Sequence, residues 1–338
     1  KRDVFVYQKQ AYFPRPDHTP ETDKVSLSWA GVRSENLASV WLTKHLCDHL
    51  TRSRLTEVAA HVGLAPRIVD GETEPYRLFR SRIRDKFGLV IDQDVVRKAA
   101  YDKIIGSIGP DLAFEGLQSE YEEIKKLHYG LGFKRFAQEI DNKLYSENEE
   151  RPLPDYEKKE LLLRKEILSR SFIIYSNLRR ELTKLLNSRV EFQSSLNFTI
   201  ENAEAELPGL YYDRISGRYI FDFPGTLPAY VSSINRANLQ QYLSGLSEVE
   251  KKDFIGQIRL GDSLSVKAFD FLDSHVDREF QKMRKLLPYS MEVLEHVDDY
   301  RIMVGLHYLV ALGRTMGIES RLEPVLSFPL GSNVTTLM

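Results

Sequence analysis

The residues best suited to chemistry in this sequence are a serine and an asparagine two positions apart, in Ser34-Glu35-Asn36. A serine hydroxyl both donates and accepts hydrogen bonds, so it can pass a proton between two groups, and an asparagine amide can hold a peptide backbone. The same spacing recurs at Ser233-Ile234-Asn235. A serine before an apolar helical pattern is also commonly a helix N-cap. The triplet therefore has a catalytic and a structural interpretation, and its flanking residues must decide between them.

A second group with possible chemistry is His45 and His49, which lie four residues apart with Asp48 between them. Two histidines at this spacing on one helix face can bind a metal ion. No glutamate completes a metalloprotease motif, so surface or interface histidines are the favoured interpretation. The single Cys47 forms no intrachain disulfide and rules out Cys-cluster metal sites. We expect neither a bound metal nor a cofactor.

The residues around Ser34 extend the triplet into a longer pattern. Residues 25–42 read VSLSWAGVRSENLASVWL. This segment resembles the Ser-x-Asn motif of class A penicillin-binding proteins. In that family the phrase opens with an apolar residue, Thr or Ser, and Leu, and continues through two variable residues to Ala and Leu. Ala30 fits this pattern, and Gly31 stands where Leu is usual.

A second stretch near the other end of the chain resembles the same family. Residues 317–337 read GIESRLEPVLSFPLGSNVTTL. The family has a helix ending in Leu-Gly-Ile, then a loop leading into Leu-Gly-Ser, an acidic or polar residue and Val-Thr. Locally, Gly317 is suited to a helix C-cap and Thr335 to the N-cap of a further helix. Together, the parts of the chain that resemble this family cover about 80 residues.

This resemblance implies a serine-type transpeptidase that cross-links bacterial peptidoglycan by acyl transfer from D-Ala-D-Ala stem peptides. Ser34 would be the catalytic relay hydroxyl and Asn36 the substrate-binding amide, and β-lactams would bind the parent protein. The location would be the periplasmic face of the inner membrane, with a membrane anchor outside this chain. The family's Ser-x-x-Lys and Lys-Thr-Gly motifs do not occur in the sequence. We expect both beyond its two ends, and this chain alone to be inactive.

Between these segments the sequence is dominated by helical periodicity. Apolar residues at three- and four-residue spacings predict helices near 76–86, 93–105, 111–127, 131–146, 234–245, 248–257, 264–286 and 289–316. Asp155 is predicted to cap one helix of about 30 residues that runs to Asn187. Residues 66–75 resemble a linker. The expected fold class is mainly α with minor β, an α+β fold.

One β-hairpin is predicted within residues 210–223, where Ser216-Gly217 forms a two-residue turn between aromatic-rich runs. In this register Tyr212 lies opposite Phe221 and Leu210 opposite Phe223. The resulting aromatic face must pack against helices or form an exposed contact surface.

The distance between the two family-like motifs predicts an insertion. Ordinary members separate these motifs by a few tens of residues, whereas Ser34 and Leu330 lie 296 positions apart. We therefore expect residues 1–65 and 300–338 to be two halves of a transpeptidase-like lobe. Residues 66–299 would be a helical insertion domain.

Composition limits the classes of partner. The 338 residues carry 47 Lys plus Arg against 49 Asp plus Glu, a net charge of -2, which argues against a nucleic-acid binder. Two alternatives to the transpeptidase stay open. The chain could be a non-catalytic helical module that docks another envelope protein through the insertion, or a cytosolic helical regulator in which Ser34 is only a cap.

Overall fold

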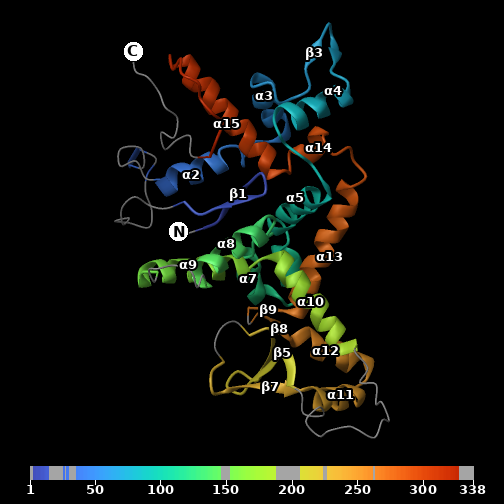
Figure 1. The fold of residues 1–338 in the computed structure, drawn as a ribbon. Helices are drawn as coiled ribbons and strands as arrows, with labels where there is room; N and C mark the ends of the chain where they lie inside the picture. Colours follow the sequence, from blue (N-terminus) through green and yellow to red (C-terminus); the bar gives the residue numbers. More distant parts are fainter. Residues whose placement is uncertain are drawn as a thin grey trace, which may run out of the picture. The chain divides into compact units, whose positions relative to one another are not determined.

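The computed structural model describes residues 3–14, 26, 28–29, 36–145, 153–187, 206–223, 227–261 and 263–326. The fold is α+β, as predicted, with 59% helix, 11% strand and small sheets. No helix within these described ranges is long and apolar enough to cross a membrane. The chain forms two compact units (Figure 1). Unit 1 comprises Lys1–Lys103, Leu131–Leu168 and Glu279–Met338, and unit 2 comprises Ile104–Gly130 and Ser169–Arg278.

Unit 1 is helical apart from two short hairpins. The hairpins are β1 (Phe5–Tyr7) with β2 (Gln10–Tyr12), and β3 (Ile68–Val69) with β4 (Glu72–Thr73). The helices are α2 (Asn36–His45), α3 (Arg52–His61), α4 (Tyr76–Ser81) with its π-helical continuation η1 (Arg82–Lys86), α5 (Gln93–Ile105), α8 (Phe133–Tyr145), α9 (Asp155–Ser169), α14 (Met291–Leu294) and α15 (Asp298–Thr315).

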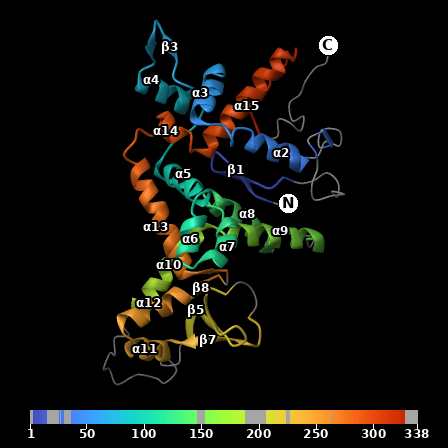
Figure 2. The same ribbon diagram turned by 180° about the vertical axis from the view of Figure 1, so that it is seen from behind.

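Helix α15 lies at the centre of the main core of unit 1. Figures 1 and 2 both show α2 and α3 beside it, with β1 next to its first turns. Tyr300, Met303 and Val304 of α15 are buried in one cluster with residues of α3, α5 and α14. The Gly305 backbone lies against Cys47, where an added Cβ would be 3.5 Å from the Cys47 sulfur. Helix α15 therefore approaches the turn after α2 closely here, and an added methyl group would make only ordinary van der Waals contact.

The segment 66–75, predicted as a linker, is instead an anchored hairpin. Strands β3 and β4 pair antiparallel with Ile68 opposite Thr73. The Glu74 carboxylate accepts hydrogen bonds from the side chain of Arg82 and from the backbone N–H of Arg67. Arg82 also donates to the carbonyls of Gly63 and Ala65. The Arg82 guanidinium holds the pKa of Glu74 below its usual range, so a buried ion pair fixes a segment that sequence pattern alone marks as irregular.

The single long helix predicted from Asp155 to Asn187 is wrong. The chain forms two helices, α9 and α10 (Phe172–Asn187), separated by Arg170 and Ser171. At the break the backbone pairs with another segment: the N–H of His128 donates to the Arg170 carbonyl, and Phe172 donates back to His128. Ser171 is 1% exposed and lies against Gly130, where a Cβ would be 2.6 Å from that of Ser171. A tertiary contact thus overrides the local helical periodicity.

Two other predicted helices are also divided. Helix α6 (Gly109–Phe114) ends before Gly116, which has a φ of +70°, and the chain continues through the 3-10 turn η2 (Gln118–Glu120) into α7 (Tyr121–Lys125). Between α14 and α15 the backbone of Val297 is extended. The helices predicted at 93–105 and 248–257 are confirmed by α5 and by α12 (Glu248–Gln257).

Unit 2 combines helices with a five-stranded sheet. Its strands β5 (Glu206–Asp213), β6 (Arg218–Phe221), β7 (Val231–Asn235), β8 (Arg259–Leu260) and β9 (Leu264–Ser265) lie in the order β7-β5-β6-β8-β9, with only the β6–β8 pair parallel. The remaining helices are α11 (Arg236–Ser244), α12 and α13 (Val266–Met283), whose last residues from Glu279 belong to unit 1. Helix α12 starts with a capping box between Ser247 and Glu250.

The hairpin is present, but the predicted register is wrong by two residues. Tyr212 pairs with Tyr219, and Leu210 pairs with Phe221. A four-residue turn joins the strands, because the Asp213 carboxylate accepts from the backbone N–H groups at positions 215 and 216. A shift of two keeps each side chain on its face. The predicted aromatic face is therefore retained, and it packs on α12, with the Tyr219 ring centroid 5.0 Å from that of Phe254.

A substitution at Gly132 tests the docking of the β1–β2 turn. Gly132 has a φ of +83°, and an added Cβ would collide with the Lys9 carbonyl oxygen. Gly88 has a φ of +74° with open space around it, so it serves as the control. We expect Gly88→Ala to lower the free energy of unfolding by about 1 kcal/mol through backbone strain alone, and Gly132→Ala by about 3 kcal/mol. Equal urea midpoints for the two variants would contradict this docking.

Candidate functional site

The structure describes only part of the site predicted from sequence. Ser34 lies outside the described residues, and Asn36 is the first residue of α2, its side chain also outside them. Helix α2 ends at His45, so His49 is not on the same helix as predicted, and His45 instead pairs with Asp48. Across the described parts of the chain, no cluster of three or more His, Cys, Asp or Glu side chains is arranged to hold a metal ion.

Helix α15 ends just before the glycine that the sequence predicts as its C-cap. Gly317 follows the helix with a φ of +90°, and the N–H of Ile318 donates to the Gly313 carbonyl. This is the Schellman arrangement, in which glycine adopts the left-handed conformation that ends the helix. Leu322 then packs back against Gly313, where a Cβ would lie 2.8 Å from its side chain. The predicted C-cap is confirmed, and residues 327–338 lie outside the described ranges.

The helix that precedes Gly317 binds the end of α2 directly. The Arg301 guanidinium of α15 donates to the carbonyls of Cys47, Asp48 and Leu50, in the turn after α2. It also donates to the Glu295 carbonyl just before α15. These carbonyls lie beyond the last residue of α2, and that of Cys47 also accepts from the Leu50 N–H, so Arg301 binds the turn that follows the helix.

The same helix also binds the end of α3. The Tyr300 hydroxyl donates to the Leu64 carbonyl at 2.9 Å, and the Tyr300 side chain is fully buried. Arg52, at the start of α3, pairs with Glu295. The helices after Ser34 and the helix before Gly317 therefore belong to one packed body, although about 250 residues separate them along the chain.

A half-buried charge cluster lies at the first turn of α15. Lys98 of α5 donates to Asp298 at 2.6 Å and to Asp102 at 2.5 Å. Next to Asp298, the Asp299 carboxylate accepts from the backbone N–H of Gln8 at 3.1 Å, in the β1–β2 turn. One lysine thus faces three carboxylates in a poorly hydrated part of unit 1.

Burial and charge separate the pKa values of these carboxyl groups. Burial raises the pKa of Asp102 to about 7, against the opposing effect of Lys98. Burial also raises the pKa of Asp299 to about 6, with the neighbouring Asp298 adding to the rise. Burial acts on Asp298 in the same direction, but Lys98 outweighs it and lowers the pKa. Burial would lower the pKa of Lys98, yet its carboxylate partners raise it.

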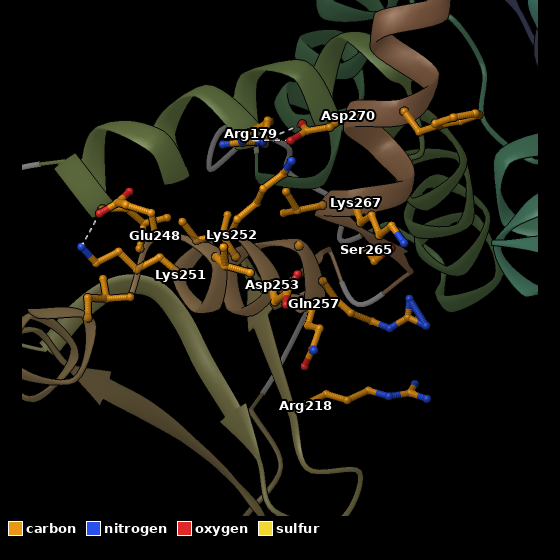
Figure 3. Close-up of a pocket in the computed structure, with 18 of the residues that line it drawn as sticks. Arg179, Arg218, Glu248, Lys251, Lys252, Asp253, Gln257, Ser265, Lys267 and Asp270 are labelled. Carbon is orange, nitrogen blue, oxygen red and sulfur yellow. Dashed lines mark hydrogen bonds and ion pairs between the residues drawn. The ribbon is translucent and has the colours of Figure 1, made fainter. Parts of the chain in front are cut away.

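Unit 2 contains a separate feature that the sequence did not reveal, a groove of about 1690 Å³. Its walls come from α10, α11, α12 and the start of α13, and from the strand residues Arg218 and Arg259. Figure 3 shows labelled lysines, arginines and carboxylates around this space. The groove is lined by both polar and apolar side chains, and it is open to solvent.

Three of the groove's cations are matched by carboxylates of unit 2. Arg179 binds Asp270 through two hydrogen bonds of 2.8 and 2.9 Å. Lys251 binds Glu248 one turn away at 2.8 Å. Arg259 binds the largely buried Glu120 at 3.0 Å, and the Ser263 carbonyl also accepts from Arg259. These pairs fix the groove walls.

The sequence held only a weak signal for this groove. Its lysines lie on amphipathic helices, where a solvent-exposed face is the usual explanation. The lysines of α12 and α13 are brought to one groove by the antiparallel β8–β9 pair that connects the two helices. Each of these strands has two residues. Strands so short leave little periodicity to detect.

The charge cluster predicts an unusual response to pH. A carboxyl group with a raised pKa binds more protons in the folded state, so its contribution to stability falls as pH rises through about 4 to 7. Asp299→Asn removes that cost and keeps an oxygen for the Gln8 N–H. We expect it to raise the free energy of unfolding by about 1–2 kcal/mol at about pH 8, allowing for solvent screening. Urea unfolding from about pH 5 to 8 measures the effect.

The neighbouring Asp298→Asn variant is the control with the opposite sign. It removes a carboxylate whose pKa is lowered and leaves Lys98 with fewer partners. We expect it to destabilise the protein at about pH 8 by about 1–3 kcal/mol. If both variants destabilise equally, the assigned charge states are wrong.

Comparison with known proteins adds no relative to this picture. No family model, no curated protein and no solved structure matches the chain. Function is therefore argued from the residues quoted above and from their geometry.

Proposed function

We propose that this chain is part of a serine-type D,D-transpeptidase of the penicillin-binding class, which acts on peptidoglycan at the periplasmic face of the inner membrane. Ser34 relays a proton between the nucleophile and the departing amine, and Asn36 binds the donor peptide backbone. The sequence contains no Ser-x-x-Lys motif, so in this proposal the nucleophile is not among its residues.

The observation that supports this proposal is the packing of α2 and α3 against α15. A family resemblance split between two ends of a chain requires that both ends contribute to one lobe. Arg301 and Tyr300 bind carbonyls in the turns that follow α2 and α3, and α15 ends just before Gly317. Packing of the two segments in one unit is what the proposal requires of them.

In this proposal residues 1–65 and 300–338 are the two parts of the lobe, and residues 66–299 are the insertion. Helix α5, from the insertion, contributes to the same core as α3 and α15. The insertion would therefore contribute residues 66–103, 131–168 and 279–299 to the compact unit that contains the lobe. Unit 2, formed wholly from inserted residues, would be the part available for another role.

Labelling of the full-length protein with a fluorescent penicillin tests the proposal. We expect covalent labelling of the wild type and a fall in its rate of about 100-fold or more in Ser34→Ala, the usual effect of removing a proton-transfer group. Ser233→Ala is the matched control. Ser233 belongs to the second triplet with the same spacing, and the Asn235 side chain of that triplet caps α11 by accepting from the N–H groups of Ala237 and Asn238. Its labelling rate is expected to be unchanged.

The result that would reject the transpeptidase is a folded full-length protein that takes up no label. Equal losses in Ser34→Ala and Ser233→Ala would also reject the assigned role of Ser34. Circular dichroism and thermal unfolding of each variant separate these outcomes from misfolding.

A further inference from the structure

The groove of unit 2 carries positive charge that its own carboxylates leave unbalanced. Six cations and four carboxylates are among the described residues that line it. Three of those cations, Arg218, Lys252 and Lys267, have no carboxylate within ion-pair distance in the described part of the chain, and Figure 3 draws none. Of the four carboxylates, only Asp253 is not in one of the three ion pairs described above. The groove therefore has a net positive charge available to a ligand.

Two of these cations, Lys252 and Lys267, lie on the adjacent helices α12 and α13. Lys252 and Gly256 lie four residues apart on α12, so they share one face of that helix. A Cβ at Gly256 would lie 3.4 Å from the Cβ of Lys267 on α13. Lys252 and Lys267 are both exposed, and both line the groove. A negatively charged ligand bound in the groove would gain from both charges.

The groove's size and apolar lining indicate what kind of anion it accepts. At about 1690 Å³ it exceeds the roughly 300–1,000 Å³ of sites for small molecules. Val249, at the start of α12, is 71% exposed, and Phe271 and Ile255 also line the groove. A chain that carries both acidic and apolar side chains matches these two features together.

The fixed carboxylates make nucleic acid the poorer match. Glu248, Asp253 and Asp270 lie among the lysines and arginines of the groove. A nucleic acid presents a negative phosphate at every step, so some phosphates would face these carboxylates. A peptide can instead place apolar side chains at those points.

We infer that this groove binds an acidic segment of a partner protein, one in which apolar side chains separate the carboxylates. Lys252, Lys267 and Arg218 bind its carboxylates, and the exposed side chain of Val249 contacts its apolar residues. This inference is independent of the transpeptidase proposal, because every residue in it belongs to unit 2. Loss of penicillin labelling would leave it unaffected.

Fluorescence anisotropy of labelled peptides on the full chain tests this inference. The probe is a fluorescein-labelled peptide of about twelve residues that repeats Glu-Glu-Leu. We expect it to bind, and we expect Lys252→Glu and Lys267→Glu each to weaken binding about fivefold or more. The matched control is Arg180→Glu, which makes the same charge change at an exposed position of α10 outside the groove. It should change the affinity by less than about twofold.

Two comparison probes separate the peptide site from other occupants. A Glu-Glu-Ser peptide of equal length should bind more weakly than the Glu-Glu-Leu peptide, and a thymidine oligonucleotide should not displace it. Equal affinity for both peptides, or displacement by the oligonucleotide, would overturn the inference in favour of a general polyanion site. No binding, or an equal effect of Arg180→Glu, would overturn it outright. Sedimentation that shows a dimer broken by Lys267→Glu would reassign the groove to a second copy of this chain.

Discussion

The first turn of α15 is the structure on which the rest of unit 1 depends. Four consecutive side chains in that turn each bind a different part of the unit: Asp298 binds Lys98 of α5, Asp299 the N–H of Gln8, Tyr300 the carbonyl of Leu64 and Arg301 the carbonyl of Cys47. Three of these four contacts are to backbone atoms, and the Leu64 carbonyl is fully buried, where a missing partner would cost free energy comparable to a lost hydrogen bond. A single helical turn therefore fixes the ends of α2 and α3, the position of α5 and the β1–β2 turn together.

The same turn contains an internal conflict of charge. Lys98 stabilises the ionised form of Asp298, yet burial leaves Asp102 and Asp299 with raised pKa values. Carboxyl groups of this kind lower stability near neutral pH, because the folded state must ionise them in a poorly hydrated setting. What offsets this cost is geometry: Asp299 is the acceptor for the Gln8 N–H. The Asp299 carboxyl group therefore lowers the free energy of unfolding near neutral pH, while the same group fixes the position of the β1–β2 turn.

Much of the local structure could be predicted from sequence, because it depends on neighbouring residues. The bounds of α5 and α12 follow from apolar periodicity, and the Gly317 cap follows from the conformational freedom of glycine. The errors share one cause, a contact that sequence spacing does not contain. Pairing with His128 divides α9 from α10, and the Asp213 side chain lengthens the hairpin turn. The candidate site divides in the same way: helices can be expected from pattern, but the meeting of α2 with α15 depends on Arg301.

The two proposed functions rest on different kinds of physical evidence. In unit 1 the polar side chains of α15 satisfy backbone atoms, so they are explained by folding whether or not a substrate binds nearby. In unit 2 the pairs Arg179–Asp270 and Arg259–Glu120 are explained by folding in the same way. Lys252 and Lys267 differ, because neither has a carboxylate within ion-pair distance among the described residues. No ion pair within unit 2 uses these two exposed charges in the described part of the chain, and for that reason the proposed binding of an acidic segment rests on them.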